Sequence, residues 1–303
     1  MTKSEVEAFL AVVHYGSISA AAEQLYITQP ALSRRIQNLE AELDYQLIHR
    51  EKGIRGITLT EQGKVFLSVA QKWSAIYQEA LSIKHLDQKA VLRIASVGSV
   101  CAYILPELFQ KFSSKDARYN LEYHSCHSWE GYSLADSGSV DLALIDFIEE
   151  TNAHNQGNVI SIPIYSVPFV FLGGPDWNPV GKLHPTELDP KKEVLLSWNT
   201  AFDRWHKYWF DVSVSPKVKL DHVSVLKDVL QDDLFAIVPR MVAKDILISN
   251  PGVTVCELLE GPSAEVIHAL TSVSSQQKKQ VQDFLNALKC SLQKRTDINC
   301  LMK

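Results

Sequence analysis

The stretch Ser17–Glu40, SISAAAEQLYITQPALSRRIQNLE, decides the fold of the N-terminal region. It contains a short helix of small apolar residues, a tight turn, and a second helix that we expect over residues 29–43. Thr28 is a good N-cap for that second helix. Pro30 lies in its first turn, where a missing N–H costs nothing. The pattern predicts two helices joined by a turn.

An earlier helix precedes this pair. Val6, Phe9, Leu10 and Val13 recur at the spacing of one helix face. Gly16 suits the left-handed residue that ends a helix. The first 45 residues are therefore predicted to form three helices around a small core.

The third helix has two different sides. Its buried stripe is predicted to be Leu32, Ile36, Leu39 and Leu43, and its first two turns carry two arginines and no acid. A positive, polar N-terminal half is what a recognition helix needs, because base contacts are made near its start. A three-helix protein-interaction module with a solvated charged face remains the alternative at this point.

Residues 46–60, QLIHREKGIRGITLT, are typical of two short strands around a basic tip flanked by glycines. We interpret them as a wing that places Arg50, Lys52 and Arg55 near phosphates. A wing beside three helices favours DNA binding over a protein-interaction module.

The motifs Ala-Ala-x-x-Leu, Thr-Gln-Pro-Ala-Leu-Ser and Leu-Thr-x-x-Gly stand in register over more than forty residues. The stretch resembles the N-terminal domain of LysR-type transcriptional regulators. That resemblance implies that Gln29, Pro30, Ser33 and Arg34 face bases. It implies phosphate contacts for Ser17, Thr28, Arg35, Gln37 and Arg50. Arg55 is added to this group because of its predicted place in the wing.

Residues 60–86 lack proline and carry a heptad pattern. Its two apolar series are Phe66, Trp73, Ala80 and Val69, Ile76, Ile83. The resemblance implies a linker helix that pairs two subunits; a core helix within one domain is the alternative. We expect residues 1–59 to be the winged helix-turn-helix domain and residues 60–89 the linker helix and hinge.

From residue 90 onward, predicted strands alternate with helices, which favours parallel sheets covered by helices. The overall fold class is α/β, with an N-terminal all-α winged helix-turn-helix, a long linker helix and a two-lobed effector domain. The resemblance implies a periplasmic-binding-protein-like effector domain over 90–303. We expect lobe I over about 90–160 and 268–303, and lobe II over about 161–267.

The same resemblance, taken by position, gives the candidate effector-binding residues. They are Ser96, Gly98, Ser99, Asp146, Ser197, Trp198, Asn199 and His222. Simpler readings remain open: Ser96 and Ser99 as N-caps, and Asp146 as a residue that ties a loop. Asp233 and Phe235 stand where the family usually has glycines, and we hypothesise that Phe235 reshapes the lobe contact or the pocket.

Composition and net charge restrict the classes of protein to which the chain can belong. The 303 residues carry a formal net charge of −5, and residues 1–60 hold six basic and seven acidic side chains, so DNA binding depends on charge placement. We do not expect the start of the chain to be a secretory signal, and no window of the sequence is apolar enough to span a membrane. Five scattered cysteines predict neither disulfides nor a metal site.

We therefore expect a cytoplasmic transcriptional regulator that is not an enzyme. No nucleophile elbow, phosphate-binding glycine loop or paired-carboxylate motif is present in the sequence. Its expected partners are double-stranded operator DNA, a second copy or a dimer of dimers, RNA polymerase, and a small polar or anionic effector of unknown identity. No cofactor is expected. The alternatives are a ligand-binding module with a degenerate head, and a redox-sensing regulator without a metabolite inducer.

Overall fold

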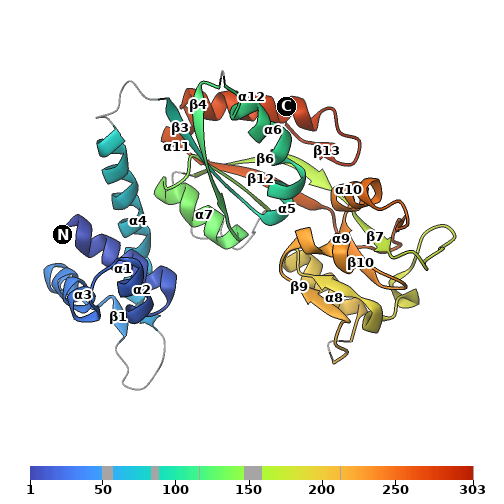
Figure 1. The fold of residues 1–303 in the computed structure, drawn as a ribbon, viewed down its shortest axis with the longest axis horizontal. Coiled ribbons are helices and arrows are strands. Elements are labelled where there is room, and N and C mark those ends of the chain that lie inside the picture. The colour runs from blue at the N-terminus through green and yellow to red at the C-terminus, as the bar shows by residue number, and fades with distance from the viewer. Residues whose placement is uncertain (50–56, 83–88, 116, 147–158, 212, 303) are drawn as a thin grey trace. The chain divides into compact units, whose positions relative to one another are not determined.

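The computed structural model describes residues 1–49, 57–82, 89–115, 117–146, 159–211 and 213–302 (Figure 1). The chain forms two compact units, of which one contains Met1–Gln88 and the other begins at Lys89. The first unit is mainly helical. The second is built on sheets with helices against them.

The helices of the first unit begin and end close to where the sequence predicts. Its elements are α1 (Lys3–Tyr15), α2 (Ile18–Gln24), α3 (Gln29–Leu43), β1 (Ile48–His49), β2 (Thr58–Leu59) and α4 (Glu61–Ser82). Strands β1 and β2 pair antiparallel, as a wing requires. The wing tip, with Arg50, Lys52 and Arg55, lies outside the described residues.

Local sequence explains the helix ends. Gly16 ends α1 with a φ of 67°, in the left-handed region that glycine tolerates. The hydroxyl oxygen of Ser17 accepts a hydrogen bond from the backbone N–H of Ala20, and that of Thr28 accepts one from Ala31. These caps satisfy N–H groups at the starts of α2 and α3.

Helix α4 differs from the predicted seam in one respect. Phe66 is buried in the core of the first unit, with its ring centroid 5.3 Å from that of Phe9. Trp73 also packs against that core and stacks on Tyr77. The predicted heptad series therefore splits: Phe66 and Trp73 stabilise the head, because α4 must itself cover α1. The exposed series is Val69, Ile76 and Ala80, and Ile83 lies outside the described residues.

The second unit contains a mixed sheet, not the parallel sheet that the sequence predicts. Within the described residues, its strand order is β13-β6-β12-β5-β3-β4. Strand β3 runs parallel to β4 and β5, whereas β12 runs antiparallel to β5 and β6. The bounds are β3 Ala90–Ser96, β4 Tyr119–Ser125, β5 Leu142–Asp146, β6 Val159–Val167, β12 Glu265–Ser272 and β13 Asn299–Cys300. Alternation of helices and strands could not reveal that the chain returns to this sheet in the opposite direction.

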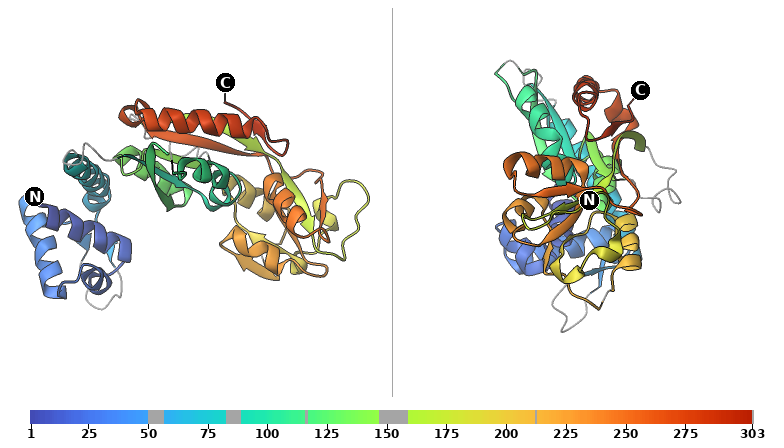
Figure 2. Two further views of the ribbon diagram at one scale, coloured as in Figure 1. Left: turned by 45° about the horizontal axis from the view of Figure 1, so that its top comes forward. Right: turned by 90° about the vertical axis from the view of Figure 1, so that its right-hand side faces the viewer.

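Helices cover both faces of this sheet. Helices α6 (Leu105–Phe112) and α12 (Lys279–Leu292) pack over β4 and β3, and α12 lies along the sheet in Figure 2. Helix α7 (Ser128–Ser137) packs against β5 through Gly131, where an added Cβ would lie 2.6 Å from Ile145. Ile145 and Leu144 point to opposite faces of β5, because side chains alternate along a strand.

A second lobe holds a smaller sheet, order β10-β7-β11, and a parallel pair, β8-β9. Its strands are β7 Phe169–Gly173, β8 Val194–Leu196, β9 Val218–Leu220, β10 Phe235–Pro239 and β11 Thr254–Cys256. Its helices include α8 Thr200–Trp209, α9 Leu226–Val229 and α10 Arg240–Ser249, with 3₁₀ turns η3 Pro185–Glu187, η4 Pro190–Lys192 and η5 Val223–Val225. Short helices α5 (Gly98–Tyr103) and α11 (Val273–Gln276) belong to the larger sheet's side of the unit.

The lobe limits move inward from those expected. Residues 159–167 and 265–272 are strands of the six-stranded sheet, so the chain crosses to the second lobe at Pro168 and returns just before Glu265. The sequence pattern predicts these crossings at 160/161 and 267/268. It cannot place them more exactly, because the residue types do not change where a chain leaves one sheet and continues into the next lobe.

Phe235 does not lie at a contact between the lobes, which was one of the two hypothesised roles, and its effect on an effector pocket stays a prediction. Phe235 is fully buried in the second lobe's core, stacked on Phe171 at 5.6 Å and near Trp177. The positive φ falls on Asp232, at 47°, and not on Asp233 or Phe235. Phe235 therefore acts through packing within one lobe.

Candidate nucleic-acid interface

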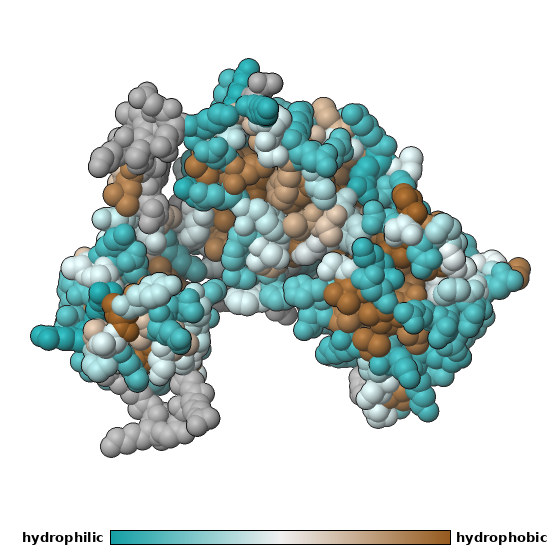
Figure 3. Space-filling view, viewed as in Figure 1, coloured by the Kyte–Doolittle hydropathy of each residue, from teal (hydrophilic) through white to brown (hydrophobic). Residues whose placement is uncertain are grey.

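The N-terminal half of α3 presents polar side chains to solvent. Gln29, Pro30, Arg34 and Gln37 are exposed, and Ser33 and Arg35 are half-buried. Leu32, Ile36 and Leu39 are buried on the opposite side, as predicted, whereas Leu43 at the end of the predicted stripe is only half-buried. On the face seen in Figure 3, the surface over α2 and α3 is mainly hydrophilic.

The charges on α3 are separated along its length. Neither Arg34 nor Arg35 forms an ion pair within the described part of the chain. The acids lie in the second half and are engaged: Glu40 accepts hydrogen bonds from the N–H groups of Leu47 and Ile48, at 2.8 and 3.2 Å, and Glu42 pairs with the N-terminal ammonium. Two guanidinium groups, the exposed one of Arg34 and the half-buried one of Arg35, therefore lie in the first half of α3 without an ion pair to any described residue, which favours an anionic partner.

The capping hydroxyls of Ser17 and Thr28 each retain a hydrogen that can be donated. Ser17 and Thr28 each accept a backbone N–H at 3.1 and 3.4 Å. A hydroxyl that accepts can still donate its own hydrogen, for example to a phosphate oxygen. Gln29 is held by Ser19, whose hydroxyl lies 3.4 Å from its Oε1.

Two further parts of the N-terminal domain are the wing arginines and Tyr26. The predicted phosphate contacts Arg50 and Arg55 lie outside the described residues. Tyr26, in the predicted turn between α2 and α3, is 95% exposed and has a φ of 54°. Its exposure depends on backbone conformation, which residue type alone does not reveal.

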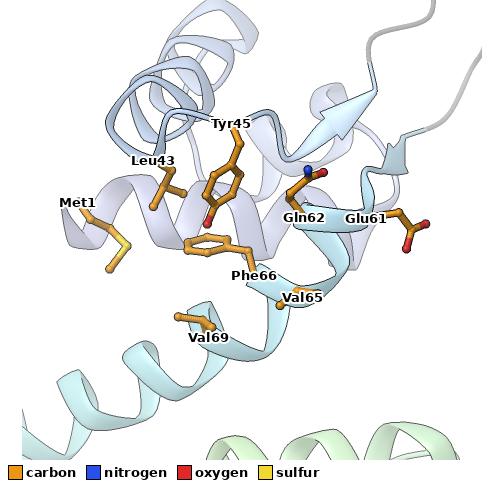
Figure 4. Close-up of a pocket in the computed structure, with 8 residues that line it drawn as sticks. All are labelled: Met1, Leu43, Tyr45, Glu61, Gln62, Val65, Phe66 and Val69. Carbon is orange, nitrogen blue, oxygen red and sulfur yellow. The ribbon is translucent and has the colours of Figure 1, made fainter. Parts of the chain in front are cut away.

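A groove opens beside the exposed side of α4 (Figure 4). Its volume is about 600 Å³, and the rings of Tyr45 and Phe66 meet edge to face at its base, 6.5 Å apart. Val65 is 69% exposed, Val69 47% and Ile76 67%, so an apolar stripe continues from the groove along α4. The lining residues are Met1, Leu43, Tyr45, Glu61, Gln62, Val65, Phe66 and Val69.

Of the candidate effector residues, Ser96 and Asp146 come together at one edge of the large sheet. Ser96 ends β3 opposite Leu144, and Asp146 lies two residues further along β5, so the two side chains share a face. Ser96 is buried, and its Oγ lies 3.1 Å from the hydroxyl of Tyr123. Asp146 accepts a short hydrogen bond from Ser128, and burial raises its pKa.

Neither serine of the first lobe caps a helix through its side chain. Val97 is the N-cap of α5, without a side-chain cap, so the N-cap reading of Ser96 and Ser99 is wrong. Gly98 is exposed and Ser99 is buried at the start of α5. Helix α5, which begins with Gly98 and Ser99, packs against η5, the second-lobe turn that follows His222. Gly98 and Ser99 therefore lie near the second lobe.

The second-lobe candidates have structural partners of their own. Trp198 donates its ring N–H to the carbonyl of Ile237 at 2.9 Å, and Asn199 caps α8 by accepting from Phe202 at 2.8 Å. Ser197 is exposed and donates to Asp203. His222 is exposed, and its side chain makes no cap. The structure thus ties Trp198 and Asn199 into the lobe.

Sequence reasoning missed one buried acidic residue, which lies where the chain passes from the second lobe back to the large sheet. Glu265 is the first residue of β12, 3% exposed, and its pKa is raised to about 8 by burial and then by Asp146. Its Oε2 has no hydrogen-bond partner among the described residues. The signal was available: Glu265 shares its alternation with the buried Ile267 and Ala269 of an apolar strand.

Other chemistries find little support in the described ranges. No group of three metal-ligating side chains occurs there, and no described helix is long and apolar enough to cross a membrane. All five cysteines are free. Burial raises the pKa of the Cys126 thiol to about 12, which leaves little reactive thiolate there.

Two family models match the chain. Residues 4–64 match "Bacterial regulatory helix-turn-helix protein, lysR family", and residues 87–293 match "LysR substrate binding domain". Among curated proteins, "Probable nitrogen assimilation transcriptional activator" of Synechocystis sp. is 26% identical over 94% of this chain and 96% of its own length. "Probable RuBisCO transcriptional regulator" of Nostoc sp. is 35% identical over 48% of this chain and 43% of its own length.

Solved structures share the fold. CbnR, a LysR family transcriptional regulator, superposes with a TM-score of 0.61 at 18% identity, over 96% of this chain and 99% of its own. A full-length OxyR variant from Pseudomonas aeruginosa gives 0.60 at 18% identity, over 95% of both chains. At such identities the likeness concerns the fold alone.

Proposed function

The chain belongs to the LysR family of bacterial transcriptional regulators, and from this premise we propose that it binds operator DNA through α3 and its wing as a homodimer or dimer of dimers. The observation that carries the proposal is the N-terminal half of α3, where the exposed Arg34 and the half-buried Arg35 have no ion pair to any described residue. Arginine suits bidentate contact with guanine.

The proposal extends to Gln29, Pro30, Ser33 and Arg34 as base-facing residues. Phosphate contacts come from Ser17, Thr28, Arg35 and Gln37, all on the same head, together with the wing arginines. Phosphate contacts position a protein on the duplex, whereas base contacts specify the sequence.

The pairing surface is the exposed stripe of α4. Val69 and Ile76 are apolar and exposed, and a second copy's α4 would cover them and the groove beside them. The pairing of two heads would place two recognition helices on half-sites about one helical turn, or a multiple, apart. A complex of the related CbnR with its target DNA has been solved.

The two-lobed unit is proposed to hold a small-molecule effector at the edge where Ser96 and Asp146 meet. An effector switches such a protein only if it binds one arrangement more tightly than another. The proposal includes contact with RNA polymerase, a cytoplasmic location and no cofactor or catalytic reaction. A redox-sensing mechanism draws no support from Cys126, whose raised pKa opposes thiolate formation.

A gel-shift series with salt titration tests the DNA-binding proposal. The wild-type chain is expected to bind its operator with an affinity that falls steeply as salt rises. Arg34→Ala should cost about 1–3 kcal/mol and relax sequence preference at one position. Arg35→Ala should instead weaken binding to all sequences about equally. If both variants bind like the wild type, α3 is not the reading helix.

A further inference from the structure

The junction of the two lobes contains a pair of buried carboxyl groups, Asp146 and Glu265, that form no ion pair with any described residue. Glu265 begins β12, the strand by which the chain returns from the second lobe, and it pairs in register with Val167, the last residue before the outward crossing. Both connections between the lobes therefore pass beside this one side chain.

Asp146 lies on the same face of the sheet, one strand away. It pairs with Ile267, two residues from Glu265, and side chains two apart on a strand point to the same side. Tyr165, opposite Ile267 on β6, also belongs to this face. Ser96, Asp146 and Glu265 thus lie at the edge formed by the carboxyl ends of parallel strands β3 and β5, where α/β sheets bind ligands.

The hydrogen-bonding capacity of the pair is not filled by the described residues. Glu265 is 3% exposed, yet its Oε2 has no partner there, and Asp146 accepts from Ser128. Of the described cations, Arg295, which lies near Tyr165, pairs with Asp297, as does Lys244. A buried carboxyl oxygen without a hydrogen-bond partner is costly whether the group is neutral or charged, which points to a partner that arrives from outside the described residues.

We propose that Asp146 and Glu265 together bind a cationic group of the effector, an ammonium or a guanidinium, at the lobe junction. This inference rests on the proposed effector function and reverses the sign of charge that the sequence suggested. The bound cation would touch the strands that carry both crossings, so its contacts depend on how the lobes are arranged.

Proton competition gives the proposal a specific signature. In the ligand-free protein the raised pKa of Glu265, about 8, keeps its carboxyl protonated at neutral pH. The groups that face it are Asp146 and Tyr165, and beyond Tyr165 the Arg295–Asp297–Lys244 set. A cation must displace that proton, so its affinity should rise about tenfold from pH 6 to 7 and level off above pH 8.

The test uses the full chain without DNA and follows thermal unfolding at pH 6, 7, 8 and 9. The probes are n-butylamine, methylguanidine and agmatine, with 1,4-butanediol and succinate as neutral and anionic comparisons. We expect at least one of the three cations to raise the Tm of the protein. Its apparent affinity should increase about tenfold from pH 6 to 7 and level off above pH 8. Glu265→Gln, which keeps the side-chain volume, should remove the response and its pH dependence, as should Asp146→Asn.

The matched control is Glu193→Gln. Glu193 is also a buried glutamate with one unpartnered oxygen within the described residues, but it lies in the second lobe and pairs with His206. It should leave the cation response intact. A response to succinate alone, or no Glu265-dependent response to any of the three cations, would overturn the proposal. Operator binding by the same preparation is measured separately, so a head that binds DNA without a cation response contradicts this inference only.

Discussion

Replacing Ile76 by glutamate tests the pairing role of α4. Ile76 is 67% exposed in the single chain, so about two thirds of its side chain is available to a partner. Burying a whole isoleucine side chain is worth roughly 1.5–3 kcal/mol, so this fraction is worth about 1–2 kcal/mol per copy. In a two-fold dimer both copies carry the substitution, so the free energy of dimerisation becomes less favourable by about 2–4 kcal/mol.

That loss corresponds to a dimer about 30- to 700-fold weaker, since about 1.4 kcal/mol is tenfold. Desolvation of the new carboxylate would add to it. Sedimentation velocity over a range of protein concentrations measures the dissociation constant. Circular dichroism melting should show an unchanged head, because Ile76 does not belong to the buried core around Phe66.

The control is Ile248→Glu on α10. Ile248 is 74% exposed, close to the exposure of Ile76, but lies in the second lobe. It should leave the dimer unchanged. A chain with Ile76→Glu that dimerises as tightly as the wild type would refute the pairing role of the exposed stripe.

Three further predictions concern stability. Phe66→Ala should lower the free energy of unfolding of the head by about 3–5 kcal/mol in urea titrations, because it empties a core position; a loss below 1 kcal/mol would place Phe66 outside the core. Thr28→Ala removes the N-cap of α3 and should cost about 0.5–2 kcal/mol, whereas an unchanged Tm would mean that the cap is dispensable. Glu265 binds its proton more tightly in the folded chain, so wild-type stability should fall by up to about 1.4 kcal/mol per pH unit between pH 4.5 and 8 relative to Glu265→Gln. Parallel pH profiles of the two proteins would contradict that linkage.

The head shows how far sequence pattern reaches. The bounds of α3, its N-cap and three of the four residues of its predicted buried stripe follow from residues 28–43, because helix ends and amphipathic faces are set by neighbours within one or two turns. The same holds for the polar face with Arg34. The heptad pattern of α4 was also real, but it could not say which apolar series faces the head and which faces solvent.

The effector unit shows where pattern stops. Ser96 and Asp146 were named by position from the family resemblance, and each ends a recognisable strand, whereas Glu265 was missed because its strand was predicted to begin at residue 268. Strand pairing joins residues more than a hundred positions apart, and nothing local to residues 265–267 records that partner.

The sequence by itself determined the family, the three-helix head, the recognition helix and the alternation of strands and helices. Those features depend on periodicity, capping and motif spacing, which are properties of short segments. Only the tertiary structure decided that Phe66 belongs to the head core, that the large sheet is mixed, and that Asp146 meets Glu265 at the lobe junction. These depend on which distant segments pack together, because burial, and with it the pKa of a carboxyl group, is created by neighbours that the chain supplies from elsewhere.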